Sequence, residues 1–134
     1  LMIHADNAMS EDLQGILAAH SERPKHCLLT MLTFTTDRPE SCGIVQTNID
    51  GIVTNFYEKV DFPPGDCANG ALYAFDSELI QYISEISPPP ADFSTEVIPN
   101  LIGHIQTWHT DQPYLDIGNP DALAKAQNLL SPNP

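Results

Sequence analysis

The chain has 134 residues, the usual length of one domain, and we expect residues 1–134 to form a single domain. Eighteen Asp and Glu residues against five Lys and Arg give a formal net charge of −13. This balance argues against general binding to nucleic acid or to an anionic membrane, because both require a basic face. An anion can still bind where a local lysine or a divalent metal ion supplies positive charge.

The first segment predicts a strand followed by a helix. Residues 1–5 are mostly apolar and indicate a short buried strand, with Asp6 at its carboxyl end. A helix is predicted over residues 10–23, with Ser10 as N-cap, because a serine oxygen can accept from the first free amides of a helix. Apolar positions at 3–4 spacing indicate one buried face, formed by Leu13, Ile16, Leu17 and His20.

The middle of the chain predicts strands. Residues 27–36 form a β-rich run with alternating threonines, and residues 69–75 form another strand. Between them, residues 43–58 contain two β-branched runs around Asp50-Gly51, which indicates a β-hairpin. A loop with prolines and a glycine follows over residues 60–68.

The last third predicts both helices and strands. Residues 76–86 form a helix that a proline run ends, and residues 92–103 form a short helix that carries a proline. Residues 105–110 and 114–118 are predicted strands. The apolar side of the helix at 76–86 is formed by Leu79, Ile80, Ile83 and Ile86.

A closing helix is predicted with Asn119 as N-cap, Pro120 at its first position and Asp121 in its first turn. The whole succession of strands and helices predicts an α/β domain with a mixed sheet flanked by helices. The sequence contains no internal repeat.

Asp6 and Asp116 each follow an apolar run and precede a loop. In open α/β sheets, binding sites gather at the carboxyl ends of strands, and two carboxylates there could share a hard divalent cation. Each aspartate could instead cap a turn or a helix, and spacing alone favours this second role, since aspartates are common in turns.

Glu58 and Lys59 form a charged pair at the end of the predicted hairpin, in a chain with few cations. An exposed ion pair between them would contribute almost nothing to stability. Neighbours in a strand point to opposite faces, so the two need not pair. The carboxylate could instead meet sugar hydroxyls, and the ammonium a phosphate, although spacing alone favours a solvent-exposed pair.

The remaining reactive residue types show no motif. The cysteines are odd in number and lack CxxC spacing, which argues against disulfides or structural zinc and favours a reducing, cytoplasmic compartment. No apolar run approaches the roughly 18 residues of a membrane span. Among the histidines, His20 is predicted to pack, and His4 shares a strand face with Asp6. The cysteines are Cys27, Cys42 and Cys67.

Five segments follow one another in a characteristic order and spacing, from about residue 1 to residue 127: LMIHADN (1–7), GIVQTNIDGIVTNFYEKV (43–60), ANGALYAFD (68–76), DFSTEVIPNLI (92–102) and YLDIGNPDALAKA (114–126). Together they resemble the sugar-1-phosphate nucleotidyltransferase family. The HADN and STEVIP stretches are most similar to the mannose- and heptose-1-phosphate guanylyltransferase-like branch.

The resemblance implies the C-terminal part of a Rossmann-like, GT-A-like nucleotidyltransferase fold. It also implies a reaction in which an NTP and a sugar 1-phosphate give a nucleotide sugar and pyrophosphate, with Mg²⁺ as cofactor. Such chemistry depends on positioning and charge neutralisation more than on covalent help from the protein.

Residue roles follow from the same resemblance. Asp6 and Asp116 match catalytic aspartates that bind the metal, and Lys59 matches a catalytic lysine that holds the sugar phosphate. Glu58 would bind sugar hydroxyls. Three further residues would contact the sugar or let the backbone approach it: Gly43, Asn69 and Gly70.

The sequence also departs from the family pattern. Val60 replaces the proline after Glu-Lys, and Tyr114 replaces a tryptophan. The chain opens inside an apolar run and contains no Gly-x-Gly-Thr-Arg nucleotide loop. We therefore expect a fragment of a longer protein, inactive alone, whose exposed sheet edge favours a homodimer.

Two other functions stay open. The chain could be a degenerate, non-catalytic module that binds sugar phosphates or regulates, or a plain globular fragment whose motifs support only the fold. Two metal-binding carboxylates and a phosphate-binding lysine favour the enzyme, because a sensor has less need for the carboxylates.

Overall fold

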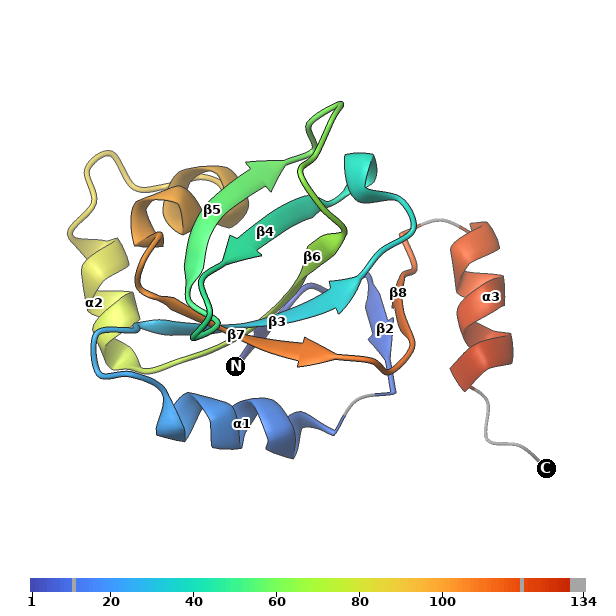
Figure 1. The fold of residues 1–134 in the computed structure, drawn as a ribbon, viewed down its shortest axis with the longest axis horizontal. Coiled ribbons are helices and arrows are strands. Elements are labelled where there is room, and N and C mark those ends of the chain that lie inside the picture. Colours follow the sequence, from blue (N-terminus) through green and yellow to red (C-terminus); the bar gives the residue numbers. More distant parts are fainter. Residues whose placement is uncertain (11, 119, 131–134) are drawn as a thin grey trace.

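Eight strands and three α-helices follow one another in the computed structural model, which describes residues 1–10, 12–118 and 120–130 (Figure 1). The strands are β1 (Met2–Ile3), β2 (Asn7–Met9), β3 (Leu29–Thr35), β4 (Gly43–Thr47), β5 (Val53–Glu58), β6 (Cys67–Phe75), β7 (Ile105–Thr110) and β8 (Tyr114–Asp116). The α-helices are α1 (Leu13–Glu22), α2 (Ser77–Ser84) and α3 (Pro120–Leu130). Three short helical turns are η1 (Pro39–Ser41), η2 (Phe93–Val97) and η3 (Ile98–Leu101).

The main sheet has the order β5-β4-β6-β3-β7, with β1 also paired to β6. β6 runs antiparallel to β3, and β7 runs parallel to it. On its other edge, β6 pairs first with β4, where Ile44 faces Ala68, and then with β1, where Met2 faces Tyr73. This mixed sheet flanked by helices confirms the predicted α/β class.

A β-bulge in β6 marks the point where its partner changes from β4 to β1. Met31 faces Tyr73 and Thr33 faces Asn69, so residues 70–72 lie opposite Leu32 alone. Ala71 takes a left-handed conformation there, with φ 49. A bulge bends its strand and redirects side chains and carbonyls, and bulges are over-represented beside functional sites.

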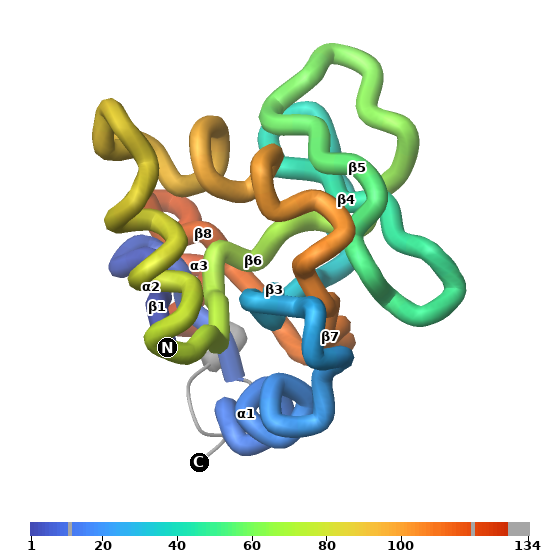
Figure 2. The backbone as a smooth tube through the Cα atoms, turned by 90° about the vertical axis from the view of Figure 1, so that its left-hand side faces the viewer, coloured from blue at the N-terminus to red at the C-terminus, as the bar shows by residue number. Residues whose placement is uncertain are grey.

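Side chains alternate along β3 and divide the core into two layers. Leu29 and Met31 pack against residues of α2, η2 and η3, whereas Leu32 packs in the cluster that contains Ile16 of α1. Figure 2 shows α1 below the strands and the η2–η3 segment above them. The sheet is therefore covered on both faces, as its apolar strands require.

The β4–β5 hairpin curls over until its turn meets β7. Thr107 donates from its backbone N and from Oγ1 to the carbonyl of Gly51, at 2.9 and 2.8 Å. The turn is closed by Asn48, whose Oδ1 accepts from the amides of Asp50 and Ile52, both at 3.0 Å. The predicted hairpin over residues 43–58 is thus confirmed, and the sheet is strongly curved.

β2 and β8 form a separate antiparallel ribbon beside the main sheet (Figure 1). Asn7 faces Asp116, and Met9 faces Tyr114. The ribbon places the two predicted metal-binding aspartates next to each other, because Asp6 directly precedes β2 and Asp116 ends β8.

The start of α1 differs from the prediction. Asp12 is the N-cap, since its side chain accepts from the amide of Gln14 at 2.9 Å, so the assignment of Ser10 was wrong. On the predicted apolar face, Ile16 and His20 are buried, which confirms that His20 packs. Leu17 is exposed, because the buried face of α1 is narrower than the 3–4 spacing of its apolar residues suggested.

The first strand is shorter than predicted and is not buried. Only Met2–Ile3 pairs with β6, and Ile3 is exposed, because β1 pairs along one edge only within the part of the chain described. His4 and Asp6 lie in the turn that follows rather than on one strand face. β2 was not predicted, since three residues are too few for a periodic signal.

Two predicted helices also need correction. Residues 92–103 form η2, a π-helical turn, and η3, a 3₁₀ turn with Pro99 near its start, rather than one helix. A proline has no amide hydrogen, so the hydrogen-bonding pattern changes there. In α2, Ile80 is exposed instead of packing beside Leu79.

Helix α3 begins at Pro120 with Asp121 in its first turn, as predicted, and the proposed N-cap Asn119 lies outside the described residues. None of the helices in the described ranges has the length and hydrophobicity needed to cross a bilayer.

His20 is a buried titratable group between α1 and the sheet. Its Nδ1 lies 2.8 Å from Thr30 Oγ1, and its Nε2 lies 3.5 Å from Asp76 Oδ2, which also accepts from Arg23 Nη2 at 2.7 Å. Burial lowers the pKa of His20, the Arg23 charge lowers it further, and Asp76 partly opposes both.

We predict that His20 makes the fold sensitive to mild acid. The folded state disfavours the protonated ring, so the unfolded chain binds the proton first. The stability that His20 contributes is complete above its ordinary pKa of 6.5 and is lost as the pH falls toward the lower pKa of the folded state. Urea unfolding at about pH 7.5 and about pH 5.5 should show a larger loss for the unsubstituted chain than for His20→Gln. Equal losses in the two proteins would contradict this assignment.

Candidate functional site

A polar hollow of about 450 Å³ lies where the β2–β8 ribbon meets the bulge of β6. All seven predicted site residues line it, although they span positions 6 to 116: Asp6, Gly43, Glu58, Lys59, Asn69, Gly70 and Asp116. The fold therefore brings together residues from the β1–β2 turn, the hairpin, the bulge and β8.

Asp6 and Asp116 approach each other at the rim of the hollow. The amide of Ile117 donates to the carbonyl of Asp6 at 2.6 Å, and the amide of Gly118 donates to Asp116 Oδ1 at 2.8 Å. A Cβ placed on Gly118 would lie 3.0 Å from Asp116 Oδ1 and 3.7 Å from Asp6 Oδ2. Both carboxylates thus reach the same point.

This donor set suits a hard divalent cation. Carboxylate oxygens are the ligands Mg²⁺ prefers, and Mg²⁺ commonly takes one or two carboxylates together with water and substrate phosphates. Two adjacent carboxylates also repel each other unless a cation lies between them. Among the described residues no group of three or more His, Cys, Asp or Glu side chains could hold a metal. Asp6 and Asp116 would therefore supply the protein's share of the ligands.

Glu58 and Lys59 also line the hollow and form an ion pair. Lys59 has φ 49, which turns its side chain back so that Nζ lies 3.8 Å from Glu58 Oε1. This differs from the extended geometry assumed for two neighbours in a strand. The side chain of Lys59 is 67% exposed and that of Glu58 26% exposed, so the ammonium can leave the pair without unfolding anything.

The surroundings of Glu58 make its carboxylate easier to protonate than it would be in water. Burial raises the pKa of Glu58, the charge of Lys59 opposes that effect, and Asp92 reinforces it. If Lys59 turned toward an anion, Glu58 would be still easier to protonate and able to donate as well as accept hydrogen bonds.

Asn69 supports the wall of the hollow as well as lining it. Its Nδ2 donates to Tyr73 Oη at 2.7 Å, and its Oδ1 accepts from the amide of Ala71 at 2.9 Å. Tyr73 is fully buried, and burial raises its pKa to about 12. The Asn69 amide therefore ties the bulge to the core.

Neighbouring side chains crowd Gly43 and Gly70, so a Cβ at either position would force a neighbour to move. A Cβ on Gly43 would lie 2.6 Å from Glu58 Oε2 and 2.6 Å from Phe56 Cζ. A Cβ on Gly70 would lie 2.3 Å from Leu32 Cδ2 and 3.2 Å from Leu32 O. Close approach of a sugar to these glycines stays a prediction.

The carbonyl of Gly70 joins the bulge to the ribbon. It accepts from Asn7 Nδ2 at 3.3 Å and from the hydroxyl of Tyr114. The Tyr114 ring stacks on Phe34, with centroids 4.4 Å apart and planes inclined by 26°. Burial raises the pKa of Tyr114, which keeps the phenol protonated and able to donate.

Sequence reasoning gave no role to several residues that line the hollow. Asp92 is the N-cap of η2, where it accepts from Thr95 N at 2.7 Å and Thr95 Oγ1 at 2.8 Å, and these bonds lower its pKa. The sequence could have indicated this N-cap, because Asp92 stands at the start of the predicted helix, three residues before Thr95. The others are His4, Asn7, Phe34, Ser41, Cys42, Ala71, Ser94, Thr95 and Tyr114.

The hollow is acidic. With His4 counted as neutral, four carboxylates and one ammonium in its lining sum to a formal charge of −3. The carboxylates are those of Asp6, Glu58, Asp92 and Asp116, and the ammonium is that of Lys59. A phosphate would be repelled from such a surface unless a divalent cation neutralised part of it. The charge balance therefore agrees with the donor set in favouring a metal ion.

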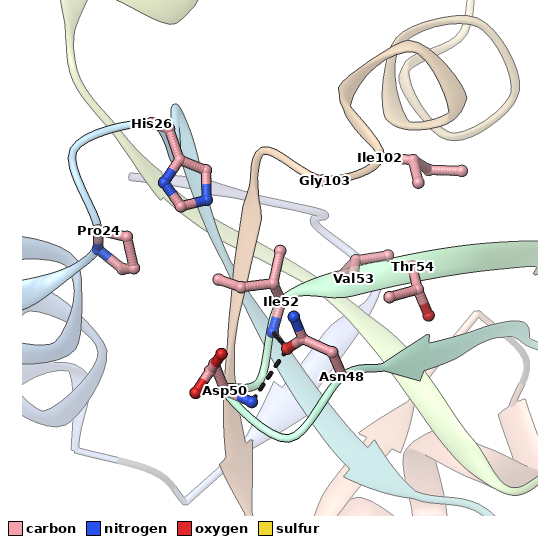
Figure 3. A pocket seen from close by; sticks show the side chains of 9 residues that line it. All are labelled: Pro24, His26, Asn48, Asp50, Ile52, Val53, Thr54, Ile102 and Gly103. Carbon is pink, nitrogen blue, oxygen red and sulfur yellow. Dashed lines mark hydrogen bonds between the residues drawn. The ribbon is translucent and has the colours of Figure 1, made fainter.

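A second hollow, of about 590 Å³, lies at the turn of the β4–β5 hairpin (Figure 3). Its wall is largely apolar, with Ile52, Val53 and Ile102, and the Oδ1 of its Asn48 is used within the turn. None of the seven predicted site residues lines it.

The family model of nucleotidyl transferases matches residues 1–132. The chain belongs to this family. Two similar proteins are glucose-1-phosphate adenylyltransferases. That of Bacillus subtilis is 27% identical over 106 residues, 76% of this chain and 28% of that protein. That of Thermomicrobium roseum is 26% identical over 136 residues, 97% of this chain and 32% of that protein.

The fold of this nucleotidyl transferase chain also matches a solved structure. A glucose-1-phosphate thymidylyltransferase of Bacillus anthracis superposes with a TM-score of 0.80 at 22% identity, over 95% of this chain and 52% of that one. The resemblance to sugar-1-phosphate nucleotidyltransferases is confirmed, whereas the mannose- and heptose-phosphate branch stays a prediction. The chain spans roughly a third of the curated relatives it matches.

We predict opposite outcomes for two neighbouring substitutions in the bulge. Gly70→Ala should cost about 1–3 kcal/mol of unfolding free energy, because the new methyl group collides with buried Leu32. Ala71→Gly should change the unfolding free energy by no more than about 1 kcal/mol, toward stabilisation if at all. Glycine removes the strain of the left-handed conformation but also increases the conformational entropy of the unfolded chain. Urea unfolding of both variants measures this. A larger loss for Ala71→Gly than for Gly70→Ala would contradict the described bulge.

Proposed function

We propose that this nucleotidyl transferase chain forms the sugar-phosphate and metal-binding part of a sugar-1-phosphate nucleotidyltransferase site. The reaction joins an NTP to a sugar 1-phosphate and releases pyrophosphate. The observation that carries the proposal is the meeting of two carboxylates, a glutamate and a lysine, from distant segments, in one hollow. The relatives' names, which all refer to glucose 1-phosphate, support this substrate class.

Asp6 and Asp116 are proposed to hold Mg²⁺ at the rim. The bound ion would neutralise phosphate charge and polarise the phosphoryl oxygens. Two backbone amides support this role before any ligand arrives: that of Ile117 joins the segment after β8 to the carbonyl of Asp6, and that of Gly118 holds the Asp116 carboxylate.

Lys59 and Glu58 are proposed to hold the sugar phosphate. The exposed ammonium would exchange its carboxylate partner for the phosphate, and Glu58 would then turn to the sugar hydroxyls. Asn69 would add a polar contact from the bulge, and Gly43 and Gly70 would keep the wall free of side chains. In this arrangement the sugar phosphate oxygen attacks the α-phosphorus of the NTP in line, and the protein contributes position rather than a covalent step.

Compartment and assembly belong to the same proposal. All three cysteines are free, which supports a reducing, cytoplasmic location. Within the described residues β1 pairs with β6 alone, so its outer edge is open to a second strand, which supports a homodimer.

We predict that Lys59→Ala weakens binding of glucose 1-phosphate or mannose 1-phosphate by about tenfold or more in the presence of Mn²⁺, because a charge-assisted bond is lost. Calorimetric titration of the chain measures this, and Mn²⁺ binding alone, followed by electron paramagnetic resonance, should stay unchanged. Lys25→Ala, on an exposed residue outside the hollow, is the matched control. Equal affinities for the Lys59→Ala and Lys25→Ala variants would refute the role of Lys59.

The same titrations separate an enzyme from a non-catalytic sugar-phosphate module. Asp116→Asn should reduce both Mn²⁺ binding and the sugar-phosphate affinity that depends on it. A module that needs no metal would keep its sugar-phosphate affinity after this substitution.

We also predict that the chain alone releases no pyrophosphate from an NTP, glucose 1-phosphate and Mg²⁺ above a protein-free control. One ammonium in a hollow of formal charge −3 is too little positive charge to hold a triphosphate as well as a sugar phosphate. A coupled pyrophosphate assay with each common NTP tests this. Turnover with any of them would contradict the proposal that this chain forms only the sugar-phosphate and metal-binding part of the site.

A further inference from the structure

We propose that Tyr114 and Asn7 are positioning residues that set the spacing between the metal-binding and sugar-phosphate-binding parts of the site. They do so by holding one carbonyl, that of Gly70. This inference rests on the function proposed above and gives a role to two residues of the matched segments to which motif matching assigned none.

The two parts of the site belong to different sheets. Asp6 and Asp116 are carried by the β2–β8 ribbon, whereas Glu58, Lys59 and Asn69 are carried by the main sheet or its edge. No strand ladder among the described residues connects the ribbon to the main sheet. Their relative position must therefore be set by side chains and by the connecting turns.

The contacts at the bulge meet this requirement. Tyr114 lies two residues before Asp116 on β8, and Asn7 faces Asp116 across the ribbon. Both donate to the carbonyl of Gly70. In the connection from β1 to β2, the amide of His4, two residues before Asp6, donates to the carbonyl of Ala71 at 3.2 Å. Each aspartate is thus anchored to the bulge within two residues.

The bulge explains why this carbonyl needs partners. Residues 70–72 lie opposite Leu32 alone, so the regular ladder is interrupted there. A buried carbonyl without a partner is costly, and Gly70 is buried. The two donors from the ribbon satisfy it, so a defect in the main sheet becomes the attachment point of the ribbon.

Tyr114 is suited to the task by its surroundings. Its ring stacks on Phe34 and packs in the layer that contains Leu32, which restricts its rotation. A tyrosine phenol is protonated at neutral pH and can donate a hydrogen bond. The hydroxyl is therefore a fixed donor, and its removal should loosen the ribbon without disturbing the ring.

The functional consequence is coupling between the two ligands. A phosphate that bridges Lys59 and a cation on Asp6 and Asp116 binds best when both parts keep one spacing. A metal ion and a sugar 1-phosphate should then strengthen each other's binding by the same factor. Loss of the hydroxyl should reduce that factor more than it reduces either affinity alone.

Tyr114→Phe tests the inference because it keeps the ring and removes only the hydroxyl. Tyr57→Phe is the matched control, since Tyr57 donates to Gln46 Oε1 at 3.1 Å on the hairpin, outside the hollow. Hydrogen exchange followed by NMR is the first readout and needs no ligand. We expect faster exchange of ribbon amides in Tyr114→Phe only, with β3 and β7 amides unchanged in both variants.

The second readout is the coupling factor, measured as the tightening of Mn²⁺ binding by glucose 1-phosphate. We expect a factor of about 5 or more in the unsubstituted chain and in Tyr57→Phe, and a factor close to 1 in Tyr114→Phe. Mn²⁺ affinity in the absence of sugar phosphate should stay within about twofold in all three proteins. If the hydroxyl only stabilised the fold, its removal would lower the melting temperature and leave the coupling factor unchanged.

The outcomes separate this inference from the proposed function. Unchanged ribbon exchange in Tyr114→Phe, or full coupling despite faster exchange, would overturn the positioning role while the proposed function stands. Absence of coupling in the unsubstituted chain would overturn both, and the exchange data would still report whether the hydroxyl joins the two sheets. If Tyr114→Phe fails to fold, Asn7→Ser is the second variant. It removes the hydrogen bond from Asn7 Nδ2 to the Gly70 carbonyl and should also lower the coupling factor.

Discussion

The interruption of β6 at residues 70–72 is the constraint on which the rest of the site depends. It ends pairing with β4, begins pairing with β1, and leaves the Gly70 carbonyl to be satisfied by side chains of the ribbon. Asn69 closes the bulge from within by bonding Ala71 and Tyr73. A small irregularity in one strand therefore determines where the hollow opens and which elements surround it.

Electrostatics gives that hollow its chemical character. The chain is acidic as a whole, and the hollow shares this sign, with a single lysine among its charged lining. A phosphate-binding site with this balance depends on a divalent cation for most of its positive charge. Under the proposed function, the ion pair of Lys59 with Glu58 keeps the exposed ammonium beside the phosphate that it would bind.

Local patterns predicted much of this arrangement. The hairpin around Asp50-Gly51 and the start of α3 at Pro120 could be predicted because turn chemistry and capping act over a few residues. Motif order also selected seven of the residues that line the hollow, including Asp6 and Asp116. The N-cap of α1, the exposure of Ile80 and the π and 3₁₀ turns after Asp92 could not be predicted reliably, because packing against other elements selects among locally similar states.

The sequence by itself determined the chemical groups of the site and the secondary structure that carries most of them, since both follow from residue type and short-range spacing. Only the tertiary structure decided that Asp6 and Asp116 reach one point, that Lys59 turns back on Glu58, and that Tyr114 and Asn7 share the Gly70 carbonyl. These relations join segments as far apart as positions 6 and 116. They depend on sheet register and on a bulge, and neither leaves a periodic signal along the chain.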